Sequence, residues 1–265
     1  MSDVQFPIIE SFTEEKPHNP NWQILGSAQL TGGSLQLTSN GRDESGTAFL
    51  DEAFDSKLGV SIEFDYAVQG SQSGDGFSVY LIDGSHTTQP GALGAGLGYS
   101  VETERKKPGV TAGYVGVGFD NYGNFSTPLA GANGIAQSKD SLVVRGSGDR
   151  DHYTEFRRLT TIPVSGGFRA GWDSGAHVQI TVIDAKLTVR TSSKTDPNGK
   201  LLLSEFDLSG QIAMPATFKI GLAAGTGGAT EIHEIRNLRV SLPAAVPLAM
   251  TGPQSATAGD PVSYT

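Results

Sequence analysis

The sequence predicts an all-β fold built from antiparallel strands. Its 265 residues include 35 glycines, and these, with many Asn, Asp, Ser and Thr residues, separate short runs rich in Val, Ile, Leu, Phe and Tyr. Short apolar runs divided by turn residues are typical of an antiparallel sandwich. No segment carries a long apolar stripe with the 3.6-residue period of a helix, so we expect almost no helix.

The expected strands follow one another along most of the chain. His177–Asp184 has buried-type residues at alternate positions, and the short Asp184-Ala185 link predicts a hairpin with Lys186–Thr191. The other expected strands are Ser34–Thr38, Gly46–Leu50, Gly59–Val68, Gly76–Ile82, Tyr114–Phe119, Ser141–Arg145, Leu201–Phe206, Thr217–Ala223 and Ile232–Ser241.

Composition excludes several classes of function. Without cysteine, the chain has no disulfide and no thiolate chemistry. Its 28 acidic and 19 basic residues give a net charge of -9, and its one basic run, Arg105–Lys107, is too short to attract a phosphate backbone. We therefore expect no nucleic acid partner. No apolar run approaches the roughly 20 residues of a membrane span, so none is expected.

The character of the chain changes near residue 242. Proline and small polar residues replace the strand pattern beyond that point. We expect one domain over residues 1–242, and over residues 243–265 a linker with the start of a truncated immunoglobulin-like repeat. A flexible stalk is the alternative. Further domains of the same chain are expected beyond the C-terminus.

The most informative stretch is VGVGFDNYGNF, residues Val115–Phe125. Its alternating apolar residues predict a strand with one buried face, which then ends in polar residues from Asp120 to Asn124. Carboxylate, amide and backbone oxygens suit calcium, which takes 6 to 8 oxygen ligands. The same groups beside the Tyr122 ring suit a sugar. An ordinary strand end with Asn/Gly turn chemistry is the competing interpretation.

Three other stretches carry possible binding loops. Asp75, at the entrance of the Gly76–Ile82 strand, can accept hydrogen bonds from two adjacent hydroxyls, or can be a simple turn residue. The glycine-rich segment Pro90–Ser100 lacks the spacing of a dinucleotide fingerprint, but its small residues let a ligand approach the backbone. In Gly221–Val240, a glycine loop joins two strands, and His233-Glu234 lacks the second histidine of a zinc motif.

These four stretches, in this order, resemble the legume-type (L-type) lectin domain, and in particular the bacterial branch found in surface adhesins. The segments FPIIESF, GTAFL, SIEFDYAV and HEIRNLRVS extend the resemblance over residues 5–242. The resemblance implies a concanavalin A-like jelly-roll sandwich of antiparallel sheets. It also implies that four loops converge on one sugar pocket, with no catalysis.

The resemblance assigns roles to individual residues in these loops. The implied sugar-binding residues are Asp75, which follows a cis peptide and accepts sugar hydroxyls, Gly96 as a backbone donor, Tyr122 as the stacking ring, Asn124, and the variable-loop residues Gly228 and Ala229. The implied calcium ligands are the Asp120 carboxylate, the Tyr122 backbone carbonyl and Asn124.

The chain also departs from the family pattern at metal-binding positions. Gly118 stands where the family has a glutamate, and Ser141 falls near its histidine, so no manganese is expected. Pro128 stands where a further aspartate completes the calcium site. We still expect calcium, with the missing ligand supplied by water or by a distant carboxylate such as Asp140, Asp149 or Asp151.

The sequence therefore predicts calcium-dependent carbohydrate binding by a lectin module of a larger secreted or surface adhesin. Its partners would be glycans on cell or matrix surfaces, and its location extracellular or at the cell surface. One alternative is a protein-binding, peptide-binding or spacer module with a vestigial pocket. Another is a glycoside hydrolase using Glu63 and Asp65, although Ala67 stands at the third alternate position.

The segment Arg145–Thr161, RGSGDRDHYTEFRRLTT, follows the expected strand Ser141–Arg145. It is rich in charged residues. We expect most of its side chains to face solvent.

Overall fold

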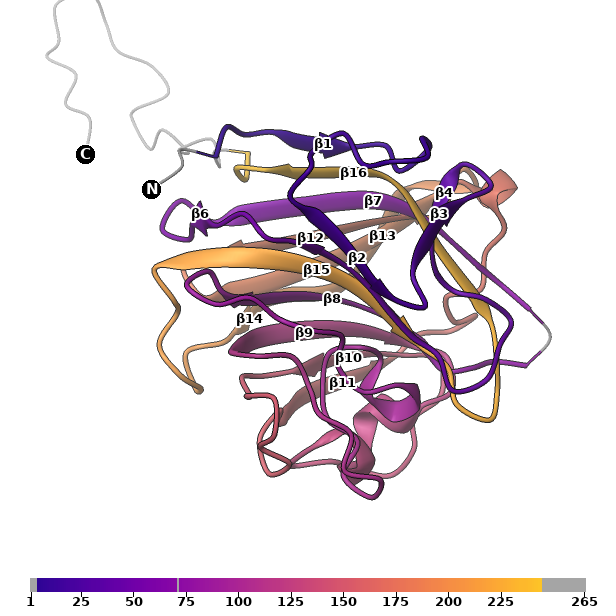
Figure 1. Cartoon of the computed structure of the whole chain (residues 1–265), viewed down its shortest axis with the longest axis vertical. Coiled ribbons are helices and arrows are strands. Elements are labelled where there is room, and N and C mark those ends of the chain that lie inside the picture. Colours follow the sequence, from indigo (N-terminus) through magenta and orange to yellow (C-terminus); the bar gives the residue numbers. More distant parts are fainter. Residues whose placement is uncertain (1–3, 71, 245–265) are drawn as a thin grey trace, which may run out of the picture.

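A computed structural model describes residues 4–70 and 72–244, which form two antiparallel sheets of eight strands each (Figure 1). Sheet A contains, in spatial order, β14 (Asp196–Asp207), β13 (Lys186–Ser193), β12 (His177–Ile183), β7 (Val60–Gln69), β16 (Ile232–Ser241), β4 (Ser34–Thr38) and β3 (Gln29–Thr31), with β1 (Ile8–Glu10) also paired to β16.

Sheet B contains, in spatial order, β11 (Arg158–Pro163), β10 (Ser141–Arg145), β9 (Gly113–Asp120), β8 (Gly76–Asp83), β15 (Thr217–Gly225), β5 (Ser45–Leu50) and β2 (Trp22–Gly26), with β6 (Phe54–Asp55) also paired to β15. Helical structure in the described residues is limited to short 3-10 turns, as the sequence predicts. These are η1 (Gly94–Gly96), η2 (Asn124–Ser126), η3 (Pro128–Ala130) and η4 (Trp172–Ser174).

The main hydrophobic core fills the space between the two sheets. Val178, Ile180 and Val182 of β12 are buried there at alternate positions, and the predicted hairpin between β12 and β13 is confirmed by their antiparallel pairing. From sheet B, Phe77 and Phe119 stack with ring centroids 4.5 Å apart. Burial of apolar area on this scale is the main stabilising contribution to such a fold.

Sheet B is covered on both of its faces, which the sequence did not predict for β9. A second cluster of buried residues packs on the face turned away from sheet A, and it includes Tyr99, Phe125 and Phe156. A Cβ atom at Gly116 would clash with the Tyr99 ring, and one at Gly118 would clash with the Phe125 ring. The glycines of β9 therefore make room for aromatic rings, which explains their alternation with valine.

The covering layer is made of long loops around sheet B. The magenta loops that follow β8 and β9 lie together at the bottom of the view in Figure 1. Part of the Arg145–Thr161 segment belongs to this layer. Arg145 and Phe156 are fully buried, whereas Asp151 and His152 are exposed. Arg145 and Phe156 depart from the expectation that most side chains of this segment face solvent, because the chain folds back over sheet B before entering β11.

The predicted linker and truncated repeat at residues 243–265 fall outside the described residues, apart from Pro243 and Ala244. Among the described residues, no helix has the length and apolarity needed to cross a membrane.

Candidate functional site

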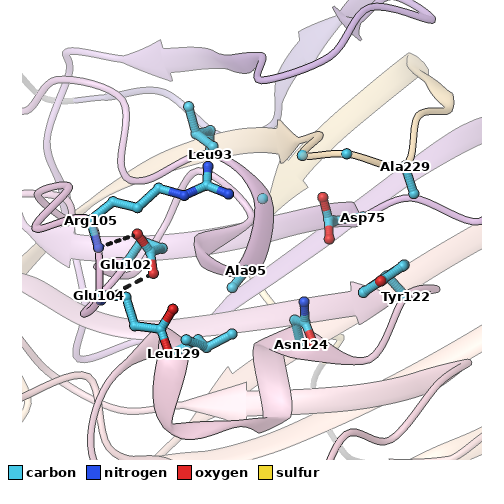
Figure 2. A pocket seen from close by; sticks show the side chains of 13 residues that line it. Asp75, Leu93, Ala95, Glu102, Glu104, Arg105, Tyr122, Asn124, Leu129 and Ala229 are labelled. Atoms are coloured by element: carbon cyan, nitrogen blue, oxygen red, sulfur yellow. Dashed lines mark hydrogen bonds between the residues drawn. The ribbon is translucent and has the colours of Figure 1, made fainter.

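A pocket of about 270 Å³ opens among the loops at one end of sheet B (Figure 2). Four chain segments contribute to it: the entrance of β8, the long β8–β9 loop, the β9–β10 loop and the β15–β16 loop. The lining residues are Asp75, Leu93, Gly94, Ala95, Glu102, Glu104, Arg105, Tyr122, Asn124, Leu129, Gly227, Gly228 and Ala229.

Asp75 lies at the centre of this arrangement. The Gly74–Asp75 peptide bond is cis, as the resemblance implies. The Asp75 backbone N–H donates to the Gly225 carbonyl at 3.0 Å, and its own carbonyl accepts from the N–H groups of Asn121 and Tyr122, both at 3.0 Å. These bonds tie Asp75 to β15 and to the start of the β9–β10 loop at once.

The Asp75 carboxylate lies in the pocket without a full set of partners. The residue is 4% exposed, and its Oδ2 atom is buried with no hydrogen bond from the described residues. Burial raises the pKa of Asp75 to about 7. This effect is partly opposed by the nearby Gly227 N–H, which donates to the Ala229 carbonyl at 3.3 Å, and by the Arg105 charge. A buried acceptor that lacks a partner costs about 1–3 kcal/mol. Hydroxyl groups of a ligand would satisfy it.

Tyr122 and Asn124 line the wall of the pocket below Asp75 in Figure 2. Both are half-buried, and the Lys139 ammonium lies 5.7 Å from the centroid of the Tyr122 ring. The Asn124 side chain makes no hydrogen bond within the described residues, so its amide is free to donate to and accept from a ligand.

The β15–β16 loop forms the opposite wall through Gly228 and Ala229. Glu231, fully buried at the end of this loop, accepts a hydrogen bond from Asn121 Nδ2 at 2.8 Å and pairs with Arg169. The loop that the resemblance assigns to sugar preference is therefore joined directly to the β9–β10 loop.

Gly96 is the predicted sugar-binding residue that does not line the pocket. It is buried in η1, and its N–H donates to the Leu93 carbonyl at 3.2 Å. Gly94 and Ala95 of the same turn line the pocket instead. The structure thus brings Asp75, Tyr122, Asn124, Gly228 and Ala229 together and leaves Gly96 behind the wall.

The sequence analysis missed the charged rim formed by Glu102, Glu104 and Arg105. Glu102 is 6% exposed, and its carboxylate accepts from the backbone N–H groups of Glu104 at 3.1 Å and Arg105 at 2.8 Å. Arg105 lies 3.4 Å from Asp43 at the surface. No periodic pattern in the sequence could place this distant loop beside Asp75. The one signal in the sequence was the basic run Arg105–Lys107, which was considered only as a possible nucleic acid site.

The predicted calcium ligands already have protein partners. The Asp120 carboxylate is fully buried, with Oδ1 accepting from the Gly123 N–H at 2.7 Å and Oδ2 from the Phe125 N–H at 2.8 Å. The Tyr122 carbonyl accepts from Gln137 Nε2 at 2.8 Å. Burial raises the pKa of Asp120 to about 8, an effect that these backbone bonds partly oppose. Asn124 alone of the predicted ligands keeps a free oxygen.

Two of the other carboxylates considered for calcium have surroundings of their own: the Asp140 side chain lies beside Gly167, and Asp151 is exposed. The Phe125 ring packs over Gly118, and Pro128 begins η3. Asp149 lines a different pocket and accepts from the Ala112 N–H at 2.9 Å. Within residues 4–70 and 72–244, no group of three or more His, Cys, Asp or Glu side chains is placed to hold a metal ion. The residues present therefore do not fit the calcium site that the sequence predicts.

The carboxylates considered for glycoside hydrolysis lie elsewhere, on β7 of sheet A. Glu63 accepts from Gln179 Nε2 at 2.7 Å, and Asp65 pairs with His177 Nδ1 at 2.8 Å. Both are cross-strand contacts between β7 and β12. Neither residue lines the pocket at Asp75.

Comparisons with known proteins agree with this architecture. A model of the legume-like lectin family matches residues 4–100. The VIP36 exoplasmic/lumenal domain in its Ca2+/Man3GlcNAc-bound form is similar with a TM-score of 0.62 and 19% identity, covering 86% of this chain and 87% of that chain. Comparison with curated proteins gives no match.

Two plant lectins show the same likeness. The metal-free form of lectin I-B4 from Griffonia simplicifolia has a TM-score of 0.60 and 19% identity, covering 89% of this chain and 99% of that chain. Lectin UEA-II complexed with galactose has a TM-score of 0.62 and 18% identity, covering 91% and 99%. The chain has the legume-lectin fold, which confirms the predicted fold class, and residues 4–100 carry the sequence pattern of the legume-like lectin family.

Proposed function

We propose that this chain binds carbohydrate in the pocket at Asp75. The observation that carries the proposal is the buried, unpartnered Oδ2 atom of Asp75 in a pocket shared with Tyr122 and Asn124. Sugars present adjacent hydroxyl donors and one apolar ring face, and this set of groups complements both. The sugar ligands named for the VIP36 and UEA-II structures support the same ligand class.

Each group has a distinct role in this proposal. The Asp75 carboxylate accepts from hydroxyls, and the Asn124 amide both donates to and accepts from the ring substituents. The Tyr122 ring packs against the apolar face of the pyranose. Gly228 and Ala229 have small side chains, so the sugar can approach the backbone closely.

The proposed activity is binding without catalysis. A retaining glycosidase needs two carboxyl groups about 5 Å apart across the scissile bond. The Glu63 and Asp65 pair is already engaged with Gln179 and His177 on sheet A, outside the pocket. This supports a lectin module in preference to a hydrolase.

We further propose that the module belongs to a larger secreted or surface adhesin that attaches to glycans on cell or matrix surfaces. Support comes from the sequence, in which a proline-rich segment follows residue 242 and acidic residues outnumber basic ones. Detection of the native protein on intact, unpermeabilised cells or in their medium tests the location. Retention inside the cells would contradict it.

A glycan array tests the binding proposal. The wild-type protein is probed in millimolar calcium and again after chelation, beside Asp75→Asn, Asn124→Ala and the control Asp184→Asn. Asp184 is exposed in the β12–β13 turn, so its variant keeps the pocket intact while losing one carboxylate.

We expect binding to a coherent set of sugars that is lost in both pocket variants and kept in the control. If both variants still bind the same sugars, the binding site must lie outside the pocket at Asp75. If the folded wild-type protein binds no glycan on a broad array, the alternative of a protein-binding, peptide-binding or spacer module with a vestigial pocket is favoured.

A further inference from the structure

Arg145 is a fully buried arginine directly beneath the loop that carries Tyr122 and Asn124. It lies at the end of β10, on the face of sheet B that the loops cover, and its relative exposure is 0%. A buried guanidinium is costly unless its N–H groups find acceptors. We therefore expect the N–H groups of Arg145 to be paired with acceptors in the surrounding loops.

The guanidinium of Arg145 donates to backbone carbonyls from two loops. Nε donates to the Phe125 carbonyl at 2.7 Å, and Nη2 to the Thr127 carbonyl at 2.6 Å. Nη1 donates to the Phe156 carbonyl at 2.6 Å and to the Ala132 carbonyl at 3.3 Å. One cation thus organises the β9–β10 loop from residue 125 to residue 132 and joins it to the segment before β11.

Asp120 holds the same loop by accepting hydrogen bonds from its backbone, whereas Arg145 donates to it. Its two carboxylate oxygens accept the N–H groups of Gly123 and Phe125, on either side of Asn124 in the chain. Phe125 is therefore bound at its N–H by Asp120 of β9 and at its carbonyl by Arg145 of β10. These two side chains fix the backbone that presents Asn124 to the pocket.

The same loop leaves no room for a side-chain ligand at position 118. The Phe125 ring packs over Gly118, and the Arg145 guanidinium carbon lies 5.3 Å from the centroid of that ring. Asp120 lies near both the Asp75 carboxyl group and the positive charge of Arg145. A divalent ion would have to compete with this positive charge and with the hydrogen bonds that the Asp120 carboxylate and the Tyr122 carbonyl already accept. Among the described residues, no group of three or more His, Cys, Asp or Glu side chains is placed to hold the ion.

We propose that Arg145 is a positioning residue that replaces a bound calcium ion, so that the ligand loop is ordered and the pocket is formed without metal. The proposal rests on the proposed carbohydrate function only where sugar affinity is the readout. The order of the loop and its response to calcium are independent of any ligand.

The first test uses the wild-type protein alone. Calcium is titrated into chelator-treated protein by calorimetry, and amide hydrogen exchange over residues 121–137 is compared in calcium and in chelator. We expect no stoichiometric heat and equal protection in both conditions. Calcium binding accompanied by slower exchange in this loop would overturn the proposal, whether or not any sugar is found.

The second test compares Arg145→Gln, Arg145→Lys and the control Arg190→Gln, which removes an exposed arginine from β13. Lysine keeps the charge with fewer donors, whereas glutamine removes the charge. We expect at least a tenfold faster exchange over residues 121–132 in Arg145→Gln, partial recovery in Arg145→Lys, and no change in the control. Exchange in β7 and β16 of sheet A reports whether each variant remains folded.

Sugar affinity adds a third readout where the array identifies a ligand. It should fall about tenfold or more in Arg145→Gln and partly recover in Arg145→Lys, with or without calcium. Equal losses in the lysine and glutamine variants would contradict a role for the charge. If glutamine fails to fold, the lysine variant and the wild-type calcium titration still decide the matter.

Discussion

Single residues in this protein are selected by what packs on them as much as by their own chemistry. Gly118 lacks a side chain because the Phe125 ring occupies the space a Cβ would need. The absence of a side chain at Gly118 and the packing of the Phe125 ring are therefore one structural feature.

Gly118→Ala should destabilise the protein by about 1–3 kcal/mol, because a methyl group forced into a packed region displaces its neighbours. The matched control is Gly210→Ala, since a Cβ at Gly210 would have no atom within 4 Å. Urea unfolding followed by fluorescence measures both. Equal midpoints for the two variants would show that Phe125 does not depend on the glycine.

His233 should make the protein less stable in mild acid. It is 1% exposed, its Nδ1 lies 2.7 Å from the Thr38 hydroxyl, and its Nε2 is buried without a partner among the described residues. The Thr38 hydroxyl donates to the Glu231 carbonyl, so Nδ1 carries the proton and Nε2 carries none. Burial lowers the pKa of His233 from its ordinary value of 6.5 to about 3.

The sign of this effect follows from proton binding. Between pH 6.5 and about 3 the unfolded chain binds a proton at His233 and the folded chain does not, so stability falls as the pH falls. From pH 7 to pH 5 the loss is about 2 kcal/mol. Asp75 and Asp120, with raised pKa values, act in the opposite direction. The quantity to measure is therefore the difference between wild type and His233→Gln.

The unfolding free energy of both proteins at pH 7 and pH 5 provides that difference. His233→Gln should lose about 2 kcal/mol less than wild type between the two values. Parallel pH profiles would mean that His233 accepts a proton in the folded state.

At the scale of elements, the regular strands were predictable and the covering loops were not. The bounds of β4, β10 and β16 agree with the expected Ser34–Thr38, Ser141–Arg145 and Ile232–Ser241. Alternating apolar residues define such strands because one face packs in the core. The strands β1, β2, β3, β6 and β11 were missed. The runs of two or three residues that form β1, β3 and β6 carry too little pattern to stand out.

The pocket was predictable in part for a related reason. Asp75, Tyr122 and Asn124 follow or precede strong strands in the sequence, so their place at the sheet edge follows from the strands themselves. Gly96, Glu102 and Arg105 belong to the long β8–β9 loop, whose path depends on side-chain packing over sheet B. The burial of Arg145 was not predicted, because the carbonyl groups that accept its hydrogen bonds come together only in the folded loop.

The β15–β16 loop should be coupled to the β11–β12 connection through the pair of Glu231 and Arg169. Its carboxylate is fully buried, while its partner Arg169 is 41% exposed. Arg169→Ala leaves that buried charge with only Asn121 as a side-chain partner, so it should cost about 1–3 kcal/mol after allowance for the exposure of Arg169. Adding Glu231→Gln should recover part of the loss, since it removes the uncompensated charge.

A double-mutant cycle by chemical denaturation measures this coupling, with Arg190→Ala as the control for loss of an arginine elsewhere in the protein. Additive effects of the two substitutions would show that Arg169 and Glu231 stabilise the protein independently of each other.

At the scale of the whole molecule, charge should limit which sugars bind. The chain has a net charge of -9, and the pocket is lined by three carboxylates, Asp75, Glu102 and Glu104, against the single cation Arg105. Arg105 also lies near Asp43, which further offsets its charge. A neutral sugar encounters only the hydrogen-bonding groups, whereas an acidic sugar meets repulsion both on approach and in the pocket.

We therefore expect a neutral glycan to bind at least several-fold more tightly than the same glycan capped with a sialic acid or sulfate group. The difference should shrink as salt is raised from about 0.05 to 0.5 M, because screening acts on charges at the exposed rim. Glu104→Gln should also reduce the difference in affinity between the neutral and the acidic glycan, because it removes one negative charge from the rim and leaves Asp75 in place. Surface binding of matched glycan pairs measures all three effects. Tighter binding of the acidic partner would mean that Arg105 turns from Asp43 to the ligand, and Arg105→Gln would then abolish that preference.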